Sequence, residues 1–425
     1  MHGPSEKIFI LLNLNRDSMP DPPSRVYFRL FLLATCFALT GSVSSLTVAA
    51  GSLVGHAISA NKALATLPLV LKLFGTMSAG FPASLLMRRV GRRNGFLIGT
   101  SLGLIGALTG AYAIFISSFT LFCTSTFTLG MMMGFNQLYR FVAVEIAGSS
   151  FKANAVSLVM VGGIVSGTLG PLLAAQGKDW VDNAPFAGGY LAVAGVYVLV
   201  IAILAFLDLP HPTVEERHGT RRSLAEFVAQ PNLILAVASA SLSYAVMAFI
   251  MTATPLAMNH RDYAFSDTAL VIQGHVMGMF LPSFFTGSLI QRFGSPRIIV
   301  TGVVLNLVCI TLNVHGESWW HFWTSLILLG IGWNFMFISG TTLLTETYRP
   351  AEKALVQGGN DFLVFAMAAS GSLLAGVLLS VMDWRELNLA ALPLLGIVVV
   401  TLIWHRLRQH LVAPEAIATE TLSGD

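Results

Sequence analysis

Charged residues are scarce in this chain of 425 residues: Asp, Glu, Lys and Arg make up 11% of it, whereas hydrophobic residues make up 55%. A water-soluble protein of this length could not cover its surface with so few polar side chains. The composition therefore excludes a soluble enzyme or a soluble binding module. It indicates that lipid is the solvent for most of the chain.

Cysteine is also rare, and the three cysteines, Cys36, Cys123 and Cys309, all fall in apolar runs. We interpret them as free thiols that pack as small hydrophobes, so we expect neither a disulfide nor a metal site. The phosphate-binding pattern G-x-x-x-x-G-K-[ST] does not occur, and the apolar runs carry no Ser/His/Asp set and no His/Glu metal spacing. We therefore predict no ATPase or other enzymatic activity and no cofactor. The small net charge of +3 gives no reason to expect nucleic acid as a partner.

The hydrophobic residues lie in long runs. About twelve of these runs are long enough to cross an apolar layer of roughly 30 Å as helices. The expected spans are Leu30–Gly55, Ala63–Met87, Gly95–Ile116, Phe119–Val142, Ala155–Ala175, Gly188–Leu207, Leu233–Met258, Ala269–Ile290, Ile298–Val314, Trp320–Leu344, Val356–Val381 and Leu387–Leu407. Strands of a membrane β-barrel would alternate apolar and polar residues, and these runs do not. The predicted fold class is an all-α membrane protein.

Lysine and arginine are distributed unevenly between the two sides of these spans. If the N-terminus lies inside, only Lys62, Lys178, Arg261 and Arg385 fall on the outer side. The positive-inside rule then places both termini in the cytoplasm. The expected domains are a cytoplasmic tail at 1–29, a six-helix bundle at 30–207, a cytoplasmic central loop at 208–232, a six-helix bundle at 233–407 and a cytoplasmic tail at 408–425. Within the central loop, Leu224–Val228 is predicted to form a short amphipathic helix on the membrane surface.

One sequence unit occurs twice, about two hundred residues apart: an apolar helix, a basic turn that contains glycine, and another apolar helix. The first copy is Ser84–Arg93 and the second is Gly287–Arg297. Two further pairs occur in the same order, namely Gly134–Asn136 with Gly332–Asn334 and Asp179–Trp180 with Asp383–Trp384. Such duplication is typical of polytopic transporters and predicts two six-helix bundles related by a pseudo-two-fold axis.

With these motifs the chain resembles the major facilitator superfamily over essentially its whole length. The family signature between spans two and three is G-x-L-x-D-R-x-G-R-R. The matching residues are Arg89, Gly91, Arg92 and Arg93 in the first copy, and Gly287, Leu289, Arg292 and Gly294 in the second. In the first copy Ser84 replaces the first glycine and Arg88 stands at the acidic position, and in the second copy Gln291 takes the acidic position.

The resemblance implies a bacterial transporter of the 12-helix type, with the two copies of the motif forming a cytoplasmic gate. In the family, the acidic residue helps to lock this gate through charge interactions with a neighbouring helix. That role cannot be transferred to Arg88 or Gln291. The resemblance also implies a multi-pass protein of the bacterial inner membrane.

Two nitrogen-bearing side chains stand at matching positions inside the spans. A charge near the bilayer centre costs at least about 2.5–3.5 kcal/mol, so it needs a partner, a wet cavity or a task. Aligning the two basic turns places Lys72 opposite His275 and Gly75 opposite Gly278. We predict that Lys72 and His275 share a central cavity, where Lys72 holds an anionic or carbonyl-rich part of a substrate and His275 binds it or changes protonation. The alternative is that Lys72 snorkels or pairs structurally and His275 is a hydrogen-bonded interior histidine.

Asp361 is the best-placed carboxylate in the membrane. It is a candidate for proton coupling, because burial and the approach of a cation move the pKa of a carboxylate in opposite directions. An equally weighted alternative is that Asp361 anchors a helix end by bonding to Asn334 or to a cytoplasmic arginine. Arg140 and Glu145, near the exit of span four, resemble a Tyr-Arg-Phe…Glu pattern of some bacterial family members. We interpret them as a gate or loop brace, with Arg140 solvated on the cytoplasmic side.

Tryptophans gather near the ends of the spans, where ring and N–H divide between lipid and water. Trp180, Trp319, Trp320, Trp323 and Trp384 are interpreted as interfacial anchors. Trp333 lies deeper, and it is a candidate for the cavity wall or for the packed core.

We predict secondary active transport of a small organic solute by alternating access, driven by protons or by the gradient of the solute. Lys72 and His275 favour a solute with anionic or aromatic hydrogen-bonding character, such as a vitamin, an organic acid or a metal chelate. One alternative is efflux of drugs or siderophores, which a partial match of Gly167–Pro171 to the family's antiporter signature suggests. Another is a sensor or scaffold that does not transport. The expected partners are the solute, the lipid bilayer and protons, and we expect a monomer.

Overall fold

The computed structural model describes residues 23–61, 64–65, 67–148, 151–379 and 381–422, and every regular element in these ranges is a helix. The expected N-terminal tail and Lys62 lie largely or wholly outside the described residues. The first half contains α2 (Pro23–Ile58), α3 (Leu67–Val90), α4 (Arg92–Phe115), α5 (Phe119–Asn136), α6 (Tyr139–Ala147), α7 (Lys152–Gln176) and α8 (Ala187–Phe206). The second half contains α11 (Pro231–Asn259), α12 (Phe265–Phe280), α13 (Ser283–Phe293), α14 (Ser295–His315), α15 (Trp319–Leu344), α16 (Lys353–Leu379), α17 (Trp384–Leu389) and α18 (Leu392–Leu422).

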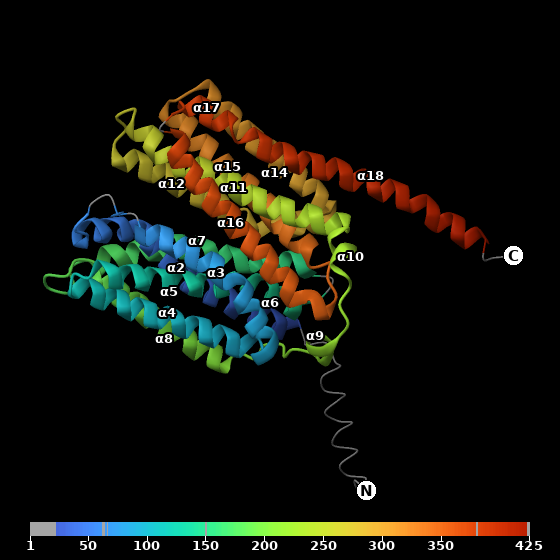
Figure 1. Cartoon of the computed structure of the whole chain (residues 1–425), viewed down its shortest axis with the longest axis horizontal. Helices are drawn as coiled ribbons and strands as arrows, with labels where there is room; N and C mark the ends of the chain where they lie inside the picture. Colours follow the sequence, from blue (N-terminus) through green and yellow to red (C-terminus); the bar gives the residue numbers. More distant parts are fainter. Residues whose placement is uncertain (1–22, 62–63, 66, 149–150, 380, 423–425) are drawn as a thin grey trace, which may run out of the picture.

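The two halves form separate bundles that lie side by side (Figure 1). In the first half, α2 packs on α7, and α5 packs on α3 and α4. In the second half, α11 packs on α15 and α16, and α15 also packs on α12 and α14. The halves meet chiefly where α3 packs on α16 and where α7 packs on α13. This confirms the predicted arrangement of two helical bundles.

The chain between the bundles carries two short helices, α9 (Val214–His218) and α10 (Leu224–Val228). The helix predicted at Leu224–Val228 is therefore confirmed, whereas α9 was not expected. Both lie at the end of the molecule where α2 begins and α18 ends, which we call the terminal end (Figure 1). The basic turns between α3 and α4 and between α13 and α14 lie at the same end.

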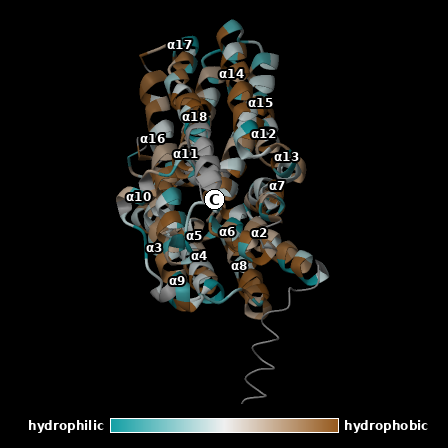
Figure 2. Cartoon of the chain, turned by 90° about the vertical axis from the view of Figure 1, so that its right-hand side faces the viewer, coloured by the Kyte–Doolittle hydropathy of each residue, from teal (hydrophilic) through white to brown (hydrophobic). Residues whose placement is uncertain are grey.

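Eleven helical segments of the described residues are long and apolar enough to cross a membrane. The predicted span that is missing from these is Phe119–Val142, because α5 carries threonines and serine along its length. This helix is nevertheless enclosed by α3 and α4. Elsewhere, large hydrophobic side chains such as Ile105, Phe206 and Val400 are exposed on the outer faces of both bundles, as lipid contact requires (Figure 2).

Two predicted spans are broken rather than continuous. The span predicted at Ala269–Ile290 divides into α12 and α13 at Leu281–Pro282, because Pro282 has no N–H to continue the helical hydrogen bonds. The span predicted at Phe119–Val142 divides into α5 and α6, where the N–H of Leu138 bonds to the carbonyl of Phe135 in a tight turn. The last helix, α18, starts at Leu392 and continues to Leu422, beyond the expected end at Leu407.

Glycines allow helices to cross closely, and they do so in the same way in both bundles. A Cβ on Gly130 of α5 would lie 2.1 Å from the carbonyl oxygen of Lys72, and one on Gly330 of α15 would lie 2.6 Å from that of His275. Gly75 and Gly278 make the corresponding close approaches from α3 and α12. The predicted alignment of Lys72 with His275 and of Gly75 with Gly278 is therefore confirmed as a structural equivalence.

The same contacts show that one predicted pairing was wrong. Because Gly130 corresponds to Gly330, Gly134 corresponds to Asn334, and the pairing of Gly134–Asn136 with Gly332–Asn334 is shifted by two residues. Asn136 bonds to Thr40 Oγ1 of α2, whereas Asn334 bonds to Ser283 Oγ of α13. The two similar tripeptides thus occupy different positions in their bundles, and their asparagines have different hydrogen-bond partners.

We expect Gly130→Ala to lower the thermal unfolding temperature of the purified protein, because the new methyl group would collide with the backbone of Lys72. Overpacking of this kind costs about 1–3 kcal/mol. Gly195→Ala in α8 is the matched control, since a Cβ there meets nothing within 4 Å. Equal unfolding temperatures for the two variants would contradict the close crossing of α3 and α5.

Candidate functional site

Both basic turns reverse the chain at a glycine with left-handed backbone. Gly91 has φ of +88° and separates α3 from α4, and Gly294 has φ of +83° and separates α13 from α14. Such φ values are strained for residues with a Cβ. The two predicted helix–turn–helix units are therefore confirmed, and they place Arg92 and Ser295 at equivalent helix starts.

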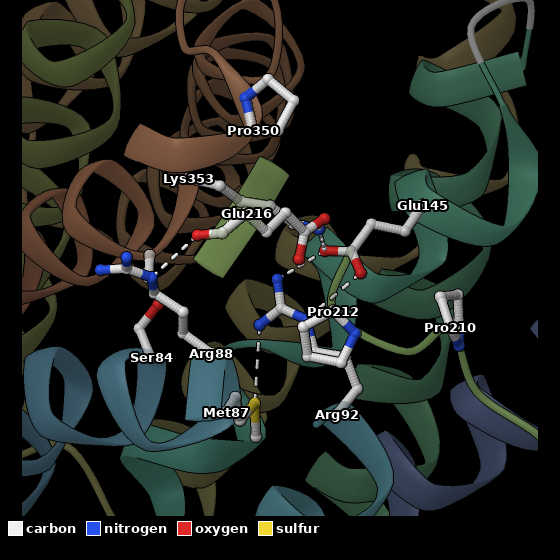
Figure 3. A pocket seen from close by; sticks show the side chains of 11 residues that line it. Ser84, Met87, Arg88, Arg92, Glu145, Pro210, Pro212, Glu216, Pro350 and Lys353 are labelled. Carbon is white, nitrogen blue, oxygen red and sulfur yellow. Dashed lines mark hydrogen bonds and ion pairs between the residues drawn. The ribbon is translucent and has the colours of Figure 1, made fainter. Parts of the chain in front are cut away.

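At the first turn, charged side chains that are buried or partly buried join the two halves. Arg92 holds Glu145 of α6 through two hydrogen bonds, Nη2 to Oε1 at 2.5 Å and Nε to Oε2 at 3.2 Å. Lys353 of α16 lies 3.0 Å from the same carboxylate and 2.7 Å from Glu216 of α9. We call Arg92, Glu145, Glu216 and Lys353 the first latch (Figure 3).

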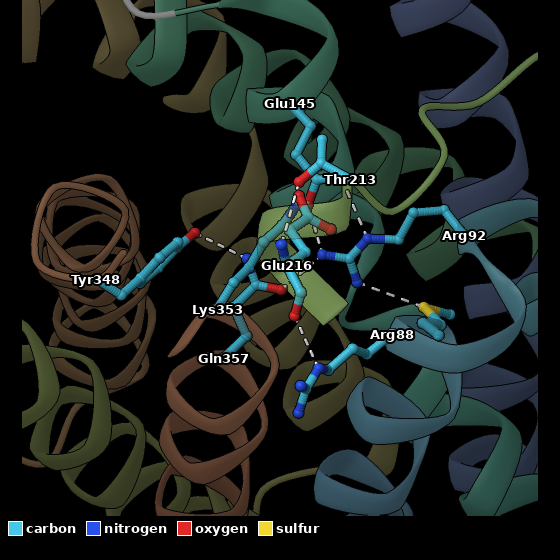
Figure 4. Close-up of polar contacts among 9 residues, drawn as sticks. Arg88, Arg92, Glu145, Thr213, Glu216, Tyr348, Lys353 and Gln357 are labelled. Carbon is cyan, nitrogen blue, oxygen red and sulfur yellow. Dashed lines mark hydrogen bonds and ion pairs between the residues drawn. The ribbon is translucent and has the colours of Figure 1, made fainter. Parts of the chain in front are cut away.

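Further hydrogen bonds tighten the first latch. Arg92 donates to Gln357 Oε1 of α16 at 2.9 Å, and Gln357 in turn donates to the hydroxyl of Tyr348 (Figure 4). Arg88 donates to the backbone carbonyl of Glu216. The space left among these side chains is only about 10 Å³, too small for more than about one water molecule. The first latch is therefore tightly packed and holds α4, α6, α9 and α16 together.

The remaining residues of the first motif have smaller roles. Arg93 donates to the carbonyls of Leu204 and Ala205 at the end of α8. Arg89 is exposed. Thus Arg92 forms the latch, Arg88 and Arg93 bind backbone oxygens, and the expected interpretation of Glu145 as a brace agrees with its ion pairs.

At the second motif, no ion pair joins the halves among the residues that the structure describes. A Cβ on Gly287 of α13 would lie 2.6 Å from Cα of Asn154, so α13 crosses α7 at close range. The Asn154 amide donates to Gln291 Oε1 at 3.1 Å. Arg292 lies over the ring of Phe293 within its own helix. Gln291, at the position where the family has an acidic residue, therefore accepts a neutral hydrogen bond across the interface.

Arg140 and Asp361 form an ion pair between the halves, deeper than the first latch. Their side chains are 1% and 0% exposed, so the prediction that Arg140 is solvated was wrong. The Arg140 guanidinium lies 4.7 Å from the ring centres of both Phe141 and Phe337, and it also donates to Gln137. Asp361 accepts a second hydrogen bond from Asn360. Of the partners proposed for Asp361, an arginine is the one it has, and Asn334 bonds elsewhere.

Lys72 and His275 lie inside their own bundles. The Lys72 ammonium donates to Ser44 of α2, at 2.7 Å to Oγ and 3.2 Å to the backbone oxygen. His275 Nδ1 lies 2.8 Å from the carbonyl oxygen of Leu326, and its Nε2 has no partner. No hydrogen bond or ion pair joins the two side chains in the described part of the chain. Their equivalence is structural, and a shared cavity stays a prediction.

Trp333 belongs to a cluster of five aromatic rings, which we call the aromatic cluster. Its members are Tyr244, Phe280, Trp333, Phe337 and Phe365. Trp333 stacks on Phe337 with ring centres 4.9 Å apart, and its indole N–H has no hydrogen-bond partner. Tyr244 is half-buried and meets three of the other rings edge-on or tilted. Because Phe337 also touches Arg140, the cluster is continuous with the buried ion pair.

Sequence reasoning missed two residues of the first latch, Glu216 and Lys353. A signal was present: Glu145 and Lys152 are seven positions apart, and so are Glu346 and Lys353. Glu216 lies on α9, which carries no periodic pattern long enough to predict. Trp384 was also misplaced, since it is 1% exposed and packs on Phe322 rather than at an interface.

Comparisons with known proteins agree with this architecture. A family model described as Major Facilitator Superfamily matches residues 30–282 and again residues 237–421. The riboflavin transporter RfnT of Brucella anthropi is 40% identical over 387 residues, which is 91% of this chain and 97% of that protein. The uncharacterized MFS-type transporter YdeG of Bacillus subtilis is 29% identical and covers 92% of this chain and 94% of its own.

Solved structures show the same fold. The transporter FucP in the outward conformation superposes with a TM-score of 0.68 at 17% identity and covers 88% of this chain and 98% of its own. The human organic anion transporter MFSD10 gives a TM-score of 0.71 at 15% identity, with 90% and 100% covered.

We expect Asp361→Leu to destabilise the protein strongly, because it leaves the Arg140 charge buried without its partner. Breaking a buried pair from one side costs about 3–5 kcal/mol. The double variant Arg140→Met/Asp361→Leu removes both charges and should recover most of this loss. Thermal unfolding of wild type, the two single variants and the double variant measures the coupling. Additive effects of the single variants Arg140→Met and Asp361→Leu would contradict a direct pair.

The first latch should be insensitive to pH near neutrality. Burial by itself favours the neutral acid, but Arg92 and Lys353 outweigh it and lower the pKa of the Glu145 carboxyl. A lowered pKa in the folded state means that the stabilisation is complete above the ordinary carboxyl range and is lost only as the pH falls through the lowered pKa. The difference in unfolding temperature between wild type and Arg92→Gln should therefore stay constant from about pH 8 to about pH 6. A difference that shrinks within this range would show that Glu145 takes up a proton there.

Proposed function

The chain belongs to the major facilitator superfamily, and on this premise we propose that it carries riboflavin, or a flavin with the same ring system, across a bacterial inner membrane by alternating access. As a member of this family it is a multi-pass membrane transporter of a small organic solute and not an enzyme. The identity of the solute, the orientation in the membrane and the driving ion are the parts of the proposal that experiment must decide.

The observation that carries the proposal is the aromatic cluster in a chain 40% identical to a riboflavin transporter over nearly its full length. Riboflavin has a flat three-ring system with an apolar edge, a polar edge with two carbonyls, and a chain of hydroxyls. Flat rings bind by stacking and by edge-to-face contact with aromatic side chains. Tyr244 is the half-buried member of the cluster, and the unpartnered indole N–H of Trp333 can donate to a carbonyl.

Polar groups in the bundle centres complement such a solute. The Lys72 ammonium bonds only to Ser44 and has no carboxylate partner in the described residues, so we propose that it donates to a flavin carbonyl from the first half. We propose that the unpartnered Nε2 of His275 serves the second half in the same way. A site between two pseudo-symmetric bundles would thus form hydrogen bonds with the flavin ring from both halves.

The contacts between the halves support a particular conformation. The first latch, the Arg140–Asp361 pair and the crossing of α7 with α13 all lie toward the terminal end. If the basic turns face the cytoplasm, as the positive-inside rule favours, both termini are cytoplasmic and the transporter is closed on that side. We propose that Asp361 is the group through which protons drive transport, since its Oδ2 has no hydrogen-bond partner and its ion pair must part before the halves separate.

Counterflow in proteoliposomes tests the solute directly, because it works in either membrane orientation. Vesicles loaded with unlabelled riboflavin should transiently accumulate labelled riboflavin, and the bare ring lumichrome should compete. Trp333→Ala should weaken riboflavin binding about tenfold or more, the loss expected for one aromatic stacking partner. Quenching of flavin fluorescence measures this affinity.

Trp320→Ala is the matched control, because Trp320 is 66% exposed near the other end of α15 and should not alter riboflavin affinity. If wild type shows no counterflow of riboflavin while it exchanges another solute, the flavin proposal is wrong and the transporter assignment stands. If Trp333→Ala binds riboflavin as tightly as wild type, the aromatic cluster is not the site.

A further inference from the structure

The terminal end contains two copies of one arrangement of acidic and basic residues, but only the first copy forms its ion pairs in the structure. Glu145 and Lys152 in the first half stand in the same order and spacing as Glu346 and Lys353 in the second. In the first latch the pairing crosses the interface, because Lys353 of the second half binds Glu145 of the first. The pseudo-two-fold axis therefore predicts that Lys152 of the first half should bind Glu346 of the second.

The second copy departs from this expectation. In the described part of the chain, no salt bridge joins Glu346 to Lys152, although both line one cavity. The cavity measures about 320 Å³, which is room for several water molecules, against about 10 Å³ at the first latch. Its other polar lining residues are Asn232, Gln291, Ser295, Thr342, His405 and Gln409.

Two differences in sequence explain the open cavity. Ser295 stands at the helix start where the first copy has Arg92, so the second copy lacks the guanidinium that bridges Glu145 and Gln357. The first latch is also covered by α9, whose Glu216 binds Lys353, whereas the second cavity is bordered by His405 and Gln409 of α18.

The pKa values of the two carboxyl groups, Glu145 and Glu346, shift in opposite directions. At the first latch, ion pairs outweigh burial and lower the pKa of the Glu145 carboxyl. In the second copy Glu346 is exposed to solvent, although partial burial raises the pKa of its carboxyl and the charge of Lys152 opposes this only in part. A carboxylate without a close cation contributes little to holding two helices together.

We propose that the gate at the terminal end opens asymmetrically: the side formed by α7 and α13, where Glu346 is already exposed to solvent, parts first, while the first latch on the side of α3 and α16 breaks last. This rests on the proposed alternating access but not on the identity of the solute. Among the described residues, charge-assisted hydrogen bonds must be broken on one side and neutral ones, such as that from Asn154 to Gln291, on the other. Arg92 then adds to the barrier that the Arg140–Asp361 pair sets on the same side, and Ser295 is the residue that keeps the second copy weak.

Two equivalent alanines provide matched reporters. Ala153 follows Lys152 and lines the second cavity, and Ala354 follows Lys353 and lines the first latch. Their exposed fractions are similar, at 4% and 7%. In a background where Cys36, Cys123 and Cys309 are replaced by alanine, Ala153→Cys and Ala354→Cys are each labelled with a soluble maleimide. We expect Ala153→Cys to react about tenfold faster, the factor for one charge-assisted hydrogen bond. Equal rates, or a faster rate at Ala354→Cys, would overturn the proposal.

Adding the missing arginine to the second copy should close the second cavity. Ser295→Arg introduces the missing guanidinium beside Glu346 and should slow the labelling of Ala153→Cys to the rate of Ala354→Cys, with slower solute exchange. Ser295→Gln is the control for size without charge and should leave the labelling rate unchanged. Adding Glu346→Gln to Ser295→Arg should restore fast labelling, which distinguishes a new ion pair from misfolding.

The labelling ratio is measured first without any solute, so that it does not depend on the flavin proposal. A high ratio with no riboflavin exchange would refute the solute and keep the asymmetric gate. Riboflavin exchange together with equal labelling rates for the two cysteines would keep the flavin proposal and refute the asymmetric gate. If Ser295→Arg leaves the labelling of Ala153→Cys fast, the missing arginine is not the cause of the weakness and the proposal fails.

Discussion

The ion pair of Arg140 and Asp361 is the constraint on which the arrangement of the two halves depends. Both side chains are fully buried, and neither can be separated from the other without leaving a charge in a low-dielectric interior. The guanidinium lies between the rings of Phe141 and Phe337, so its position is fixed by one residue from each half. The pair therefore resists separation of the bundles at its own depth, and the first latch adds a second layer toward the terminal end.

The aromatic cluster connects this constraint to the proposed solute. Phe337 touches Arg140 on one side and stacks on Trp333 on the other. A flat ring that enters the cluster would displace one of these contacts and so act on the ion pair through a single side chain. Binding and gating would then share residues, and a solute could shift the equilibrium between closed and open states only through such differential contacts.

Composition and repeated motifs predicted the helical membrane fold, the two bundles and the equivalence of Lys72 with His275, because lipid imposes long apolar runs and duplication preserves spacing. Side-chain partners could not be predicted in the same way. Arg140 follows α5 in a stretch that the positive-inside rule assigns to solvent, and only its ion pair with Asp361 of α16 and its 1% exposure show that it is buried. Glu216 lies in a five-residue helix whose position depends on contacts distant in sequence. The shifted pairing of Gly134 shows that short motifs without a turn do not fix register.

Distances between spin labels across the terminal end test the account most directly. Labels on Arg89→Cys of α3 and Arg349→Cys before α16 report the separation of the halves from two exposed positions. In wild type without solute we predict one short, narrow distance distribution, and in Asp361→Leu a broad distribution extended to longer distances. An unchanged, narrow distribution in Asp361→Leu would contradict the claim that this buried pair holds the two halves closed.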